Sequence, residues 1–424
     1  MTNVFDYQEG ELFAEGVAVS DLADQYGTPL YVYSRKAFSD HYLAYANAFE
    51  GKNALVCYAI KANSNLAVLN VLAKLGAGFD IVSVGELERV LQAGGDASKC
   101  VFSGVAKTAD EMRRALAVGV HCFNVESAAE LERLNEVAVE MGVKAPVSLR
   151  VNPDVDAQTH PYISTGLKEN KFGVDIDTAL DVYARANELE GIDIKGVDCH
   201  IGSQLTQLDP FLDALDRVLA LVDRLAEQGI VLEHIDLGGG LGVTYDDEVP
   251  PTPQEFADAV WPKLKDRNVK LVLEPGRSIA ANAGIFVTQV EFLKSNEEKN
   301  FAIIDGGMND LIRPSLYSAW QRIVEVQPRQ NVEKKPYDVV GPVCESTDTF
   351  ARNLQLPAGI KAGDLMVFAL AGAYSAVMSN SYNSRALVPE VLIRDGQATV
   401  IRPRISPQTL MEFESSTQVI TLDS

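Results

Sequence analysis

One pattern repeats between about residues 54 and 275 and limits the fold more than any other feature: a short β-branched run, a turn, and apolar residues at helical spacing. Eight runs are candidate strands: 54–60, 78–82, 100–103, 120–125, 147–151, 194–200, 235–237 and 269–273. Eight β/α units in about 220 residues match a TIM-like (β/α)8 barrel. A doubly wound open sheet is the alternative.

The starts of the intervening helices carry capping boxes, in which a Ser or Thr bonds the N3 amide and a Glu reaches back. These pairs are Ser83/Glu86, Thr108/Glu111, Ser127/Glu130 and Thr252/Glu255. The segment 211–228 has leucines along one face and stops at Gly229, as expected for an amphipathic helix packed on a sheet.

After Gly276 the pattern changes to short alternating runs broken by Gly, Pro and Asp-Gly turns. The runs are 285–290, 301–304, 337–340, 365–369 and 398–401. They predict a second, β-rich domain of the barrel or sandwich type. The segment 11–19 also alternates, so we expect the barrel at 31–275 and the β-rich domain at 1–30 with 276–424.

Composition narrows the classes of partner. The chain has 424 residues, 47% of them hydrophobic, and a net charge of -22 without a basic run, which argues against nucleic acid as a partner. The N-terminus lacks a basic segment followed by an apolar one, and no apolar run reaches about 18 residues, so we expect no membrane partner and a cytoplasmic location. Five widely spaced cysteines without a CxxC pair predict neither a disulfide framework nor a metal site.

Active sites of such barrels lie at the C-terminal ends of the strands, where Lys61 ends an otherwise apolar run. A desolvated lysine there can act as a neutral amine nucleophile. A rim lysine that only extends its ammonium into water is the alternative.

The run Gly238, Gly239 and Gly240 follows a late strand, so its bare amides could bind a phosphate, although tight turns use the same residues. Glu274, at the end of the eighth strand, could keep a ring nitrogen protonated, and Arg277 could bind a carboxylate with two hydrogen bonds. An ion pair between Glu274 and Arg277 explains that segment equally well. His200 suits stacking on a ring, but structural histidines are common.

Seven motifs occur in a characteristic order along the chain. They are YAIKAN at 58–63, HIGSQ at 200–204, DLGGGLG at 236–242, EPGR at 274–277, RPSLY at 313–317, GPVCESTD at 341–348 and GAY at 372–374. With them the chain resembles, over nearly its whole length, the fold-type III pyridoxal-phosphate (PLP) decarboxylases. It is most similar to the branch that converts meso-2,6-diaminopimelate to L-lysine and CO2.

The resemblance implies PLP as the cofactor. Lys61 is expected to form a Schiff base with it, His200 to stack on its ring, and Glu274 to pair with the ring nitrogen. The residues expected around the phosphate are Ser203, Gly238, Gly239, Gly240, Gly276 and Tyr374.

The resemblance also implies how an amino-acid substrate is held. Arg277, Arg313 and Tyr317 are expected to receive the carboxylate at the non-reacting end, with Tyr374 as a further substrate contact. Cys344 is expected to return a proton to the reacting carbon, and Glu345 to bind the distal ammonium. Both would come from the partner subunit of a homodimer.

Other activities remain open at this stage. A related ornithine, arginine or carboxynorspermidine decarboxylase is the next alternative, although two arginines suit an amine tail poorly. An alanine-racemase-like enzyme, a small PLP-carrying barrel protein and a non-catalytic partner-binding relative follow. The β-rich domain argues against the small barrel protein, and the set Lys61, His200, Glu274 and Cys344 favours catalysis over partner binding.

Overall fold

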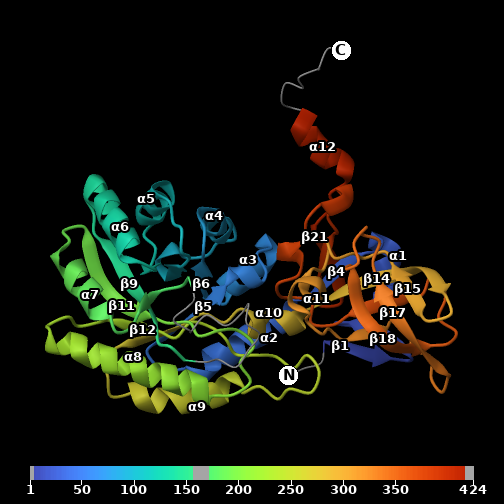
Figure 1. Cartoon of the computed structure of the whole chain (residues 1–424), viewed down its shortest axis with the longest axis horizontal. Helices are drawn as coiled ribbons and strands as arrows, with labels where there is room; N and C mark the ends of the chain where they lie inside the picture. Colours follow the sequence, from blue (N-terminus) through green and yellow to red (C-terminus); the bar gives the residue numbers. More distant parts are fainter. Residues whose placement is uncertain (1–3, 156–170, 416–424) are drawn as a thin grey trace. The chain divides into compact units, whose positions relative to one another are not determined.

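The computed structural model describes residues 4–155 and 171–415. Residues 38–280 form one compact unit, and the described residues of 1–37 and 281–424 form the other (Figure 1). Each unit has its own sheet and its own buried core.

The first unit is a closed barrel of eight parallel strands. Its strands, in spatial order, are β5 (Ala54–Ala59), β6 (Gly78–Ile81), β7 (Cys100–Phe102), β8 (Cys122–Val125), β9 (Ala145–Asn152), β11 (Ile192–Asp198), β12 (His234–Asp236) and β13 (Lys270–Leu273). Pairing of β13 with β5 and of β8 with β9 closes the ring, which confirms the barrel over the open sheet. The two-residue strand β10 (Val174–Asp175) adds to β9.

Helices on the outside of the ring cover its strands (Figure 1). They include α2 (Arg35–Ala48), α3 (Leu66–Lys74), α4 (Val84–Gln92), α5 (Ala109–Val118), α6 (Ala128–Met141), α7 (Ala179–Glu188), α8 (Asp209–Glu227), α9 (Pro253–Leu264) and α10 (Arg277–Ala280). The helix expected at 211–228 is α8, whose buried face includes Leu215, Leu221 and Leu225. Because one apolar stripe of each helix faces the strands, the ring is buried on both sides.

The four expected capping boxes form in two ways. Thr108 and Thr252 make complete boxes with Glu111 and Glu255. Ser83 and Ser127 also cap their helices, but their glutamates accept from an amide one residue earlier than the N-cap, at Val82 and Glu126. In the second case the buried ammonium of Lys107 also holds the glutamate, Glu130, at 2.7 Å.

The second unit is built on a mixed sheet, which confirms the β-rich domain. Its main path is β18 (Thr349–Pro357), β17 (Lys334–Val340), β15 (Asn300–Ile304), β14 (Gly284–Ser295), β4 (Leu30–Ser34), β20 (Glu390–Arg394) and β21 (Gln397–Arg402). β19 (Leu365–Phe368) pairs with β14 and with β16 (Ile323–Glu325). Strand β4, which falls inside the range expected for the barrel, pairs here with β14 and β20.

The N-terminal segment packs in this second unit. It forms β1 (Phe5–Gln8), β2 (Glu11–Ala14), β3 (Val17–Ala18) and α1 (Val19–Tyr26). Leu12 and Val19 share a buried cluster with Ile285, Val287 and Val391, and the Leu12 amide donates to the Val326 carbonyl at 2.8 Å. The apolar side of the alternating segment is therefore buried against the C-terminal half of the chain.

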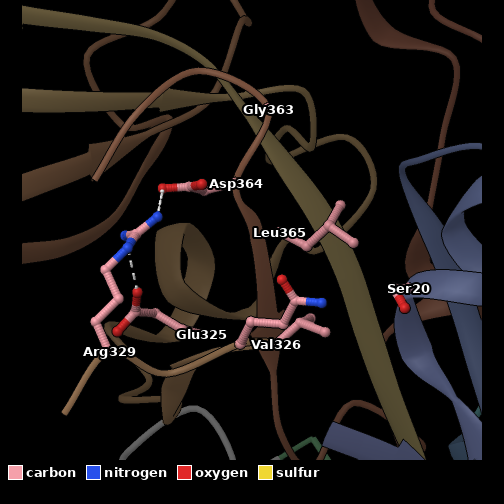
Figure 2. Close-up of a pocket in the computed structure, with 8 residues that line it drawn as sticks. Ser20, Glu325, Val326, Arg329, Gly363, Asp364 and Leu365 are labelled. Carbon is pink, nitrogen blue, oxygen red and sulfur yellow. Dashed lines mark hydrogen bonds and ion pairs between the residues drawn. The ribbon is translucent and has the colours of Figure 1, made fainter. Parts of the chain in front are cut away.

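The same unit contains a cavity of about 360 Å³ beside β16 and the start of β19. Figure 2 shows Arg329 in its wall, between Glu325 and Asp364, with Ser20 on the far side. Over the described part of the chain, none of the helices has the length and apolar character needed to cross a membrane.

Candidate active site

Lys61 lies just after β5, in the short 3-10 helix η1 (Ile60–Ala62). Its Nζ donates to Asp80 Oδ2 on the neighbouring strand β6 at 2.7 Å. The Asp80 side chain is fully buried, whereas 40% of the Lys61 side chain is exposed. Asp80 therefore orients the amine as a cation at the mouth of the barrel, and the amine must lose a proton before it can act as a nucleophile.

The glycine run after β12 turns where side chains do not fit. A Cβ on Gly238 would lie 2.7 Å from His200 Nδ1, and one on Gly239 would lie 2.3 Å from the Glu274 carbonyl oxygen. Gly240 has φ +123°, a conformation that strains other residues. Close packing therefore requires glycine at these positions. Without side chains, the backbone amides of the loop are accessible to an anion.

His200 lies two residues beyond β11 and contacts this loop. Its Nδ1 accepts a hydrogen bond from the Gly239 amide at 3.3 Å. Burial, with the nearby cations of Arg150 and Lys61, lowers the pKa of His200 well below its ordinary value. The imidazole is therefore neutral, and a neutral flat ring can stack on an aromatic ligand.

Ser203 and Arg277 are linked directly. Nε and Nη2 of Arg277 both donate to Ser203 Oγ at 3.1 Å, and Nη1 donates to the Tyr245 hydroxyl at 2.7 Å. Arg277 is buried, with 7% of its surface exposed. The guanidinium is thus held next to a hydroxyl of the HIGSQ motif.

Glu274 follows β13 and is buried with two other carboxyl groups. Its Oε1 accepts from Asn124 Nδ2 at 3.2 Å. Carboxylate oxygens of Asp198, Asp236 and Glu274 all lie within 4.8 Å of one another. Burial, followed by the charges of Asp236, Asp80 and Asp198, raises the pKa of Glu274 well above its ordinary value. An acid in this setting gains from a nearby cation such as a protonated ring nitrogen.

The barrel residues fit PLP. A loop that a Cβ would fill offers amides for a phosphate, an amine stands at a strand end, and a buried carboxyl group lies behind the same loop. These are the three functions that a pyridine aldehyde with a phosphate tail needs from a protein.

The second unit holds the remaining expected residues in two groups. Arg313 and Tyr317 are the first and last residues of α11 (Arg313–Tyr317), so they are four residues apart and share one face. Arg313 is buried and Tyr317 is half-buried. Tyr374, also half-buried, has φ +53° in the segment after β19.

Cys344 and Glu345 lie on a loop that hydrogen bonds keep in shape. The Cys344 amide donates to Asn383 Oδ1 at 3.1 Å, and the Tyr382 hydroxyl donates to Glu345 Oε1 at 2.9 Å. Asp348 accepts from the amides of Val343 and Met308 at 2.6 and 2.7 Å. Both Cys344 and Glu345 are exposed on the single chain, as residues offered to another molecule would be.

Comparison with known proteins identifies the family. The model of the pyridoxal binding domain of pyridoxal-dependent decarboxylases matches residues 35–281. A diaminopimelate decarboxylase of Pseudomonas aeruginosa is 61% identical over 97% of this chain and 99% of its own length. The chain belongs to the diaminopimelate decarboxylase family. The Vibrio cholerae member is 57% identical over 97% of this chain and 98% of its own length.

Solved structures of the family agree with this assignment. The Helicobacter pylori diaminopimelate decarboxylase complexed with L-lysine has 42% identity and a TM-score of 0.90, covering 94% of this chain and 99% of that one. The M. jannaschii enzyme in co-complex with L-lysine has 39% identity and a TM-score of 0.92, covering 97% and 98%. The cofactor of this diaminopimelate decarboxylase family member is pyridoxal 5'-phosphate, and its substrate is an amino acid.

Several residues of the site were missed from sequence. Asp80 holds Lys61, Tyr245 holds Arg277, and Asp198 and Asp236 contact Glu274. The available signal was an acidic residue inside or at the end of a short apolar strand, as in GFDI at 78–81 and HID at 234–236. Buried acids are rare without partners, so this signal marks a polar site inside the barrel.

Proposed function

We propose that this chain removes one carboxyl group from meso-2,6-diaminopimelate with PLP as cofactor, giving L-lysine and CO2. The amine of Lys61, together with the glycine loop and Glu274 in a chain 61% identical to a diaminopimelate decarboxylase, is the observation that carries the proposal. Relatives that hold L-lysine support lysine as the product.

The proposed roles in the barrel follow from these contacts and from the resemblance. Lys61 binds the cofactor through its amine, His200 stacks on the ring, and Glu274 pairs with the ring nitrogen. The phosphate is assigned to Ser203, Gly238, Gly239, Gly240, Gly276 and Tyr374. When bound, the cofactor supplies an electron sink for the pair left by the departing carboxylate.

Lys61 and Cys344 are the proposed proton-handling residues. Lys61, held on Asp80, would give its ammonium proton to solvent before its amine could hold the cofactor, and Asp80 would keep Nζ oriented. Cys344 is proposed to give the proton of its Sγ to the carbon that lost CO2, as a general acid.

Specificity is assigned to the far end of the substrate, which carries a carboxylate and an ammonium. Arg313, with Tyr317 beside it on α11, is proposed for the carboxylate and Glu345 for the ammonium. The two hydrogen bonds from Arg277 to Ser203 favour an additional role for Arg277 at the phosphate end. Its contact with the substrate carboxylate stays a prediction, as does that of Tyr374.

A homodimer in the cytoplasm completes the proposal, with Cys344 and Glu345 acting in the site of the partner subunit. Their exposure on the single chain supports this arrangement. Mixing the inactive variants Lys61→Ala and Cys344→Ala tests it, because a mixed dimer would contain one intact site. Restored CO2 release is expected, and no restoration in a proven mixed dimer would place both residues in one chain's site.

The activity is tested by CO2 release and amine analysis with added PLP. Meso-diaminopimelate should be decarboxylated to lysine, whereas L-lysine, L-ornithine and L-arginine should give background rates. Faster release from ornithine or arginine would favour the related basic amino-acid decarboxylases. The Lys61→Ala chain is the control for cofactor-dependent background.

A further inference from the structure

Of the buried carboxylates of the barrel unit, some lie beside a cation and others do not. Three carboxylates each have a cation within ordinary ion-pair distance: Asp80 with Lys61, Glu130 with Lys107, and Glu126 with Arg150, at 2.7, 2.7 and 2.9 Å. For the other three, Asp198, Asp236 and Glu274, the part of the chain that the structure describes supplies one ion-pair contact, from Arg150 Nε to Asp198 at 3.8 Å.

These last three carboxyl groups form a compact cluster, which we call the acid triad. They are exposed by only 2%, 0% and 7%, and their oxygens lie within 4.8 Å of one another. Asp198 Oδ1 and Asp236 Oδ2 are buried without a hydrogen-bond donor among the described residues. Three adjacent buried anions would repel strongly, so not all of them can be ionised at once.

Asp236 occupies the connecting position in the triad. It is the last residue of β12, and its Oδ1 accepts from the amide of Gly238 at 2.7 Å. The Gly238 carbonyl in turn accepts from the Glu274 amide at 2.8 Å. Asp236 thus bonds the glycine loop directly and lies within 4.8 Å of the Glu274 carboxylate, so it connects the two parts proposed to hold opposite ends of the cofactor.

We infer that Asp236 is a positioning residue that shares a proton with Glu274 and Asp198 in the cofactor-free barrel and holds Glu274 toward the ring nitrogen of the bound cofactor. The inference rests on the proposed function for the direction in which Glu274 acts. The shared proton does not depend on turnover, since it follows from the buried geometry alone.

The surroundings of Asp236 oppose its ionisation. The groups that interact electrostatically with Asp236 are the carboxyls of Asp80, Asp198 and Glu274, the thiols of Cys57, Cys122 and Cys199, and the amide of Asn124. The nearby cations act on its neighbours: Arg150 on Asp198 and Lys61 on Glu274. Burial raises the pKa of Asp236 to about 7, even though the Gly238 amide favours the charged form.

The sign of the resulting pH dependence is definite. An unfolded aspartate loses its proton near pH 4, whereas the folded Asp236 keeps it up to about pH 7. The folded cofactor-free chain binds the extra proton in that window, so its stability falls as pH rises from about 4 to about 7 and then levels off. A cation on the bound cofactor would stabilise the ionised carboxylates, so the shared proton would no longer be needed.

The test compares wild-type and Asp236→Asn chains, stripped of PLP, by thermal unfolding across this pH range and by infrared detection of protonated carboxyl groups. The variant should keep the Gly238 hydrogen bond, show a weaker acid C=O band, and have a flatter dependence of Tm on pH. Asp338→Asn is the matched control, because Asp338 is also buried and accepts from a backbone amide, that of Asn353, but forms an ion pair with Lys299 in the other unit and so should hold no extra proton.

If Asp236→Asn does not fold, Asp198→Asn replaces it as the test variant. It should also weaken the infrared band of protonated carboxyl groups, because only Asp236 and Glu274 remain to share the proton. Re-addition of PLP should move the pH dependence of cofactor absorbance in Asp236→Asn but not in Asp338→Asn. An unchanged acid band and unchanged Tm profile in the triad variants would overturn the inference. Because these readouts need no substrate, failure of the decarboxylase assay would leave them standing.

Discussion

Each unit places acidic side chains around an arginine, but the two groups differ in how far the arginine neutralises the acids. In the β-rich unit, Arg329 donates to Glu325 at 3.2 Å and to Asp364 at 2.6 Å at the wall of a cavity (Figure 2). In the barrel, Arg150 is committed to Glu126 and reaches only one member of the acid triad, at 3.8 Å.

Burial decides what each arrangement means. The Arg329 side chain is 30% exposed, so water screens its ion pairs with Glu325 and Asp364 and solvates the charges. The barrel group has almost no access to water, where unmatched charge is costly. Buried carboxylates without cations therefore destabilise the folded barrel. They become favourable when the bound cofactor places a cation beside them.

The largest effect should come from the barrel mouth. Lys61→Ala is expected to abolish the visible absorbance of bound PLP and to reduce decarboxylation to background, because no other described amine bonds to Asp80. Absorbance spectra and CO2 release measure both. Lys263→Ala, which removes a half-buried lysine paired with Asp216 away from the strand ends, should change neither. Wild-type absorbance or turnover in the Lys61 variant would contradict the assignment.

Next in size is the loss of a buried cation. Arg150→Met should reduce the unfolding free energy of the cofactor-free chain by about 3–5 kcal/mol, because Glu126 and Asp198 would lose their buried partner. Urea denaturation at neutral pH measures the change. Recovery of part of the loss at lower pH is expected, since protonation neutralises the stranded acids. A loss below about 1 kcal/mol would show that the barrel charges are not matched as described.

A smaller effect is expected on substrate binding. Arg313→Ala should raise the KM for meso-diaminopimelate by about 30- to 150-fold, which corresponds to about 2–3 kcal/mol for a charge-assisted contact. The kcat should change less, because the lost contact is remote from the reacting carbon. Arg352→Ala, which alters an exposed arginine of the same unit, is the control for steady-state kinetics. An unchanged KM would assign Arg313 elsewhere.

The smallest effect should come from the half-exposed pair. Arg329→Met is expected to cost about 1 kcal/mol or less of unfolding free energy, with decarboxylation unchanged. Urea denaturation beside Arg150→Met makes the comparison direct. Equal losses in the two variants would remove the contrast between the units.

Much of the fold could be predicted because its signals are local. The strand–turn–helix repeat located all eight barrel strands to within a few residues, since each buried strand must be apolar and each covering helix needs one apolar stripe. Strands such as β18 and β20 were not predicted. In β18 the buried and exposed positions do not alternate regularly, and β20 is short and apolar without a flanking helix.

The site divides in the same way. Motif order located Lys61, the glycine run and Glu274, because each combines an unusual residue type with a strand end. Asp80, Asp198 and Asp236 gave a weaker signal, since a single acid in a short strand does not reveal which way it points or what it meets.

The sequence by itself determined the repeat, the motifs and hence the family, because these depend on spacing along one chain. Only the tertiary structure decided that β8 pairs with β9 to close the ring, that β4 joins the β-rich sheet, and that three acids meet behind the glycine loop. The physical reason is that pairing and charge balance depend on residues far apart in the chain. Their energies follow from distance and burial, which folding alone sets.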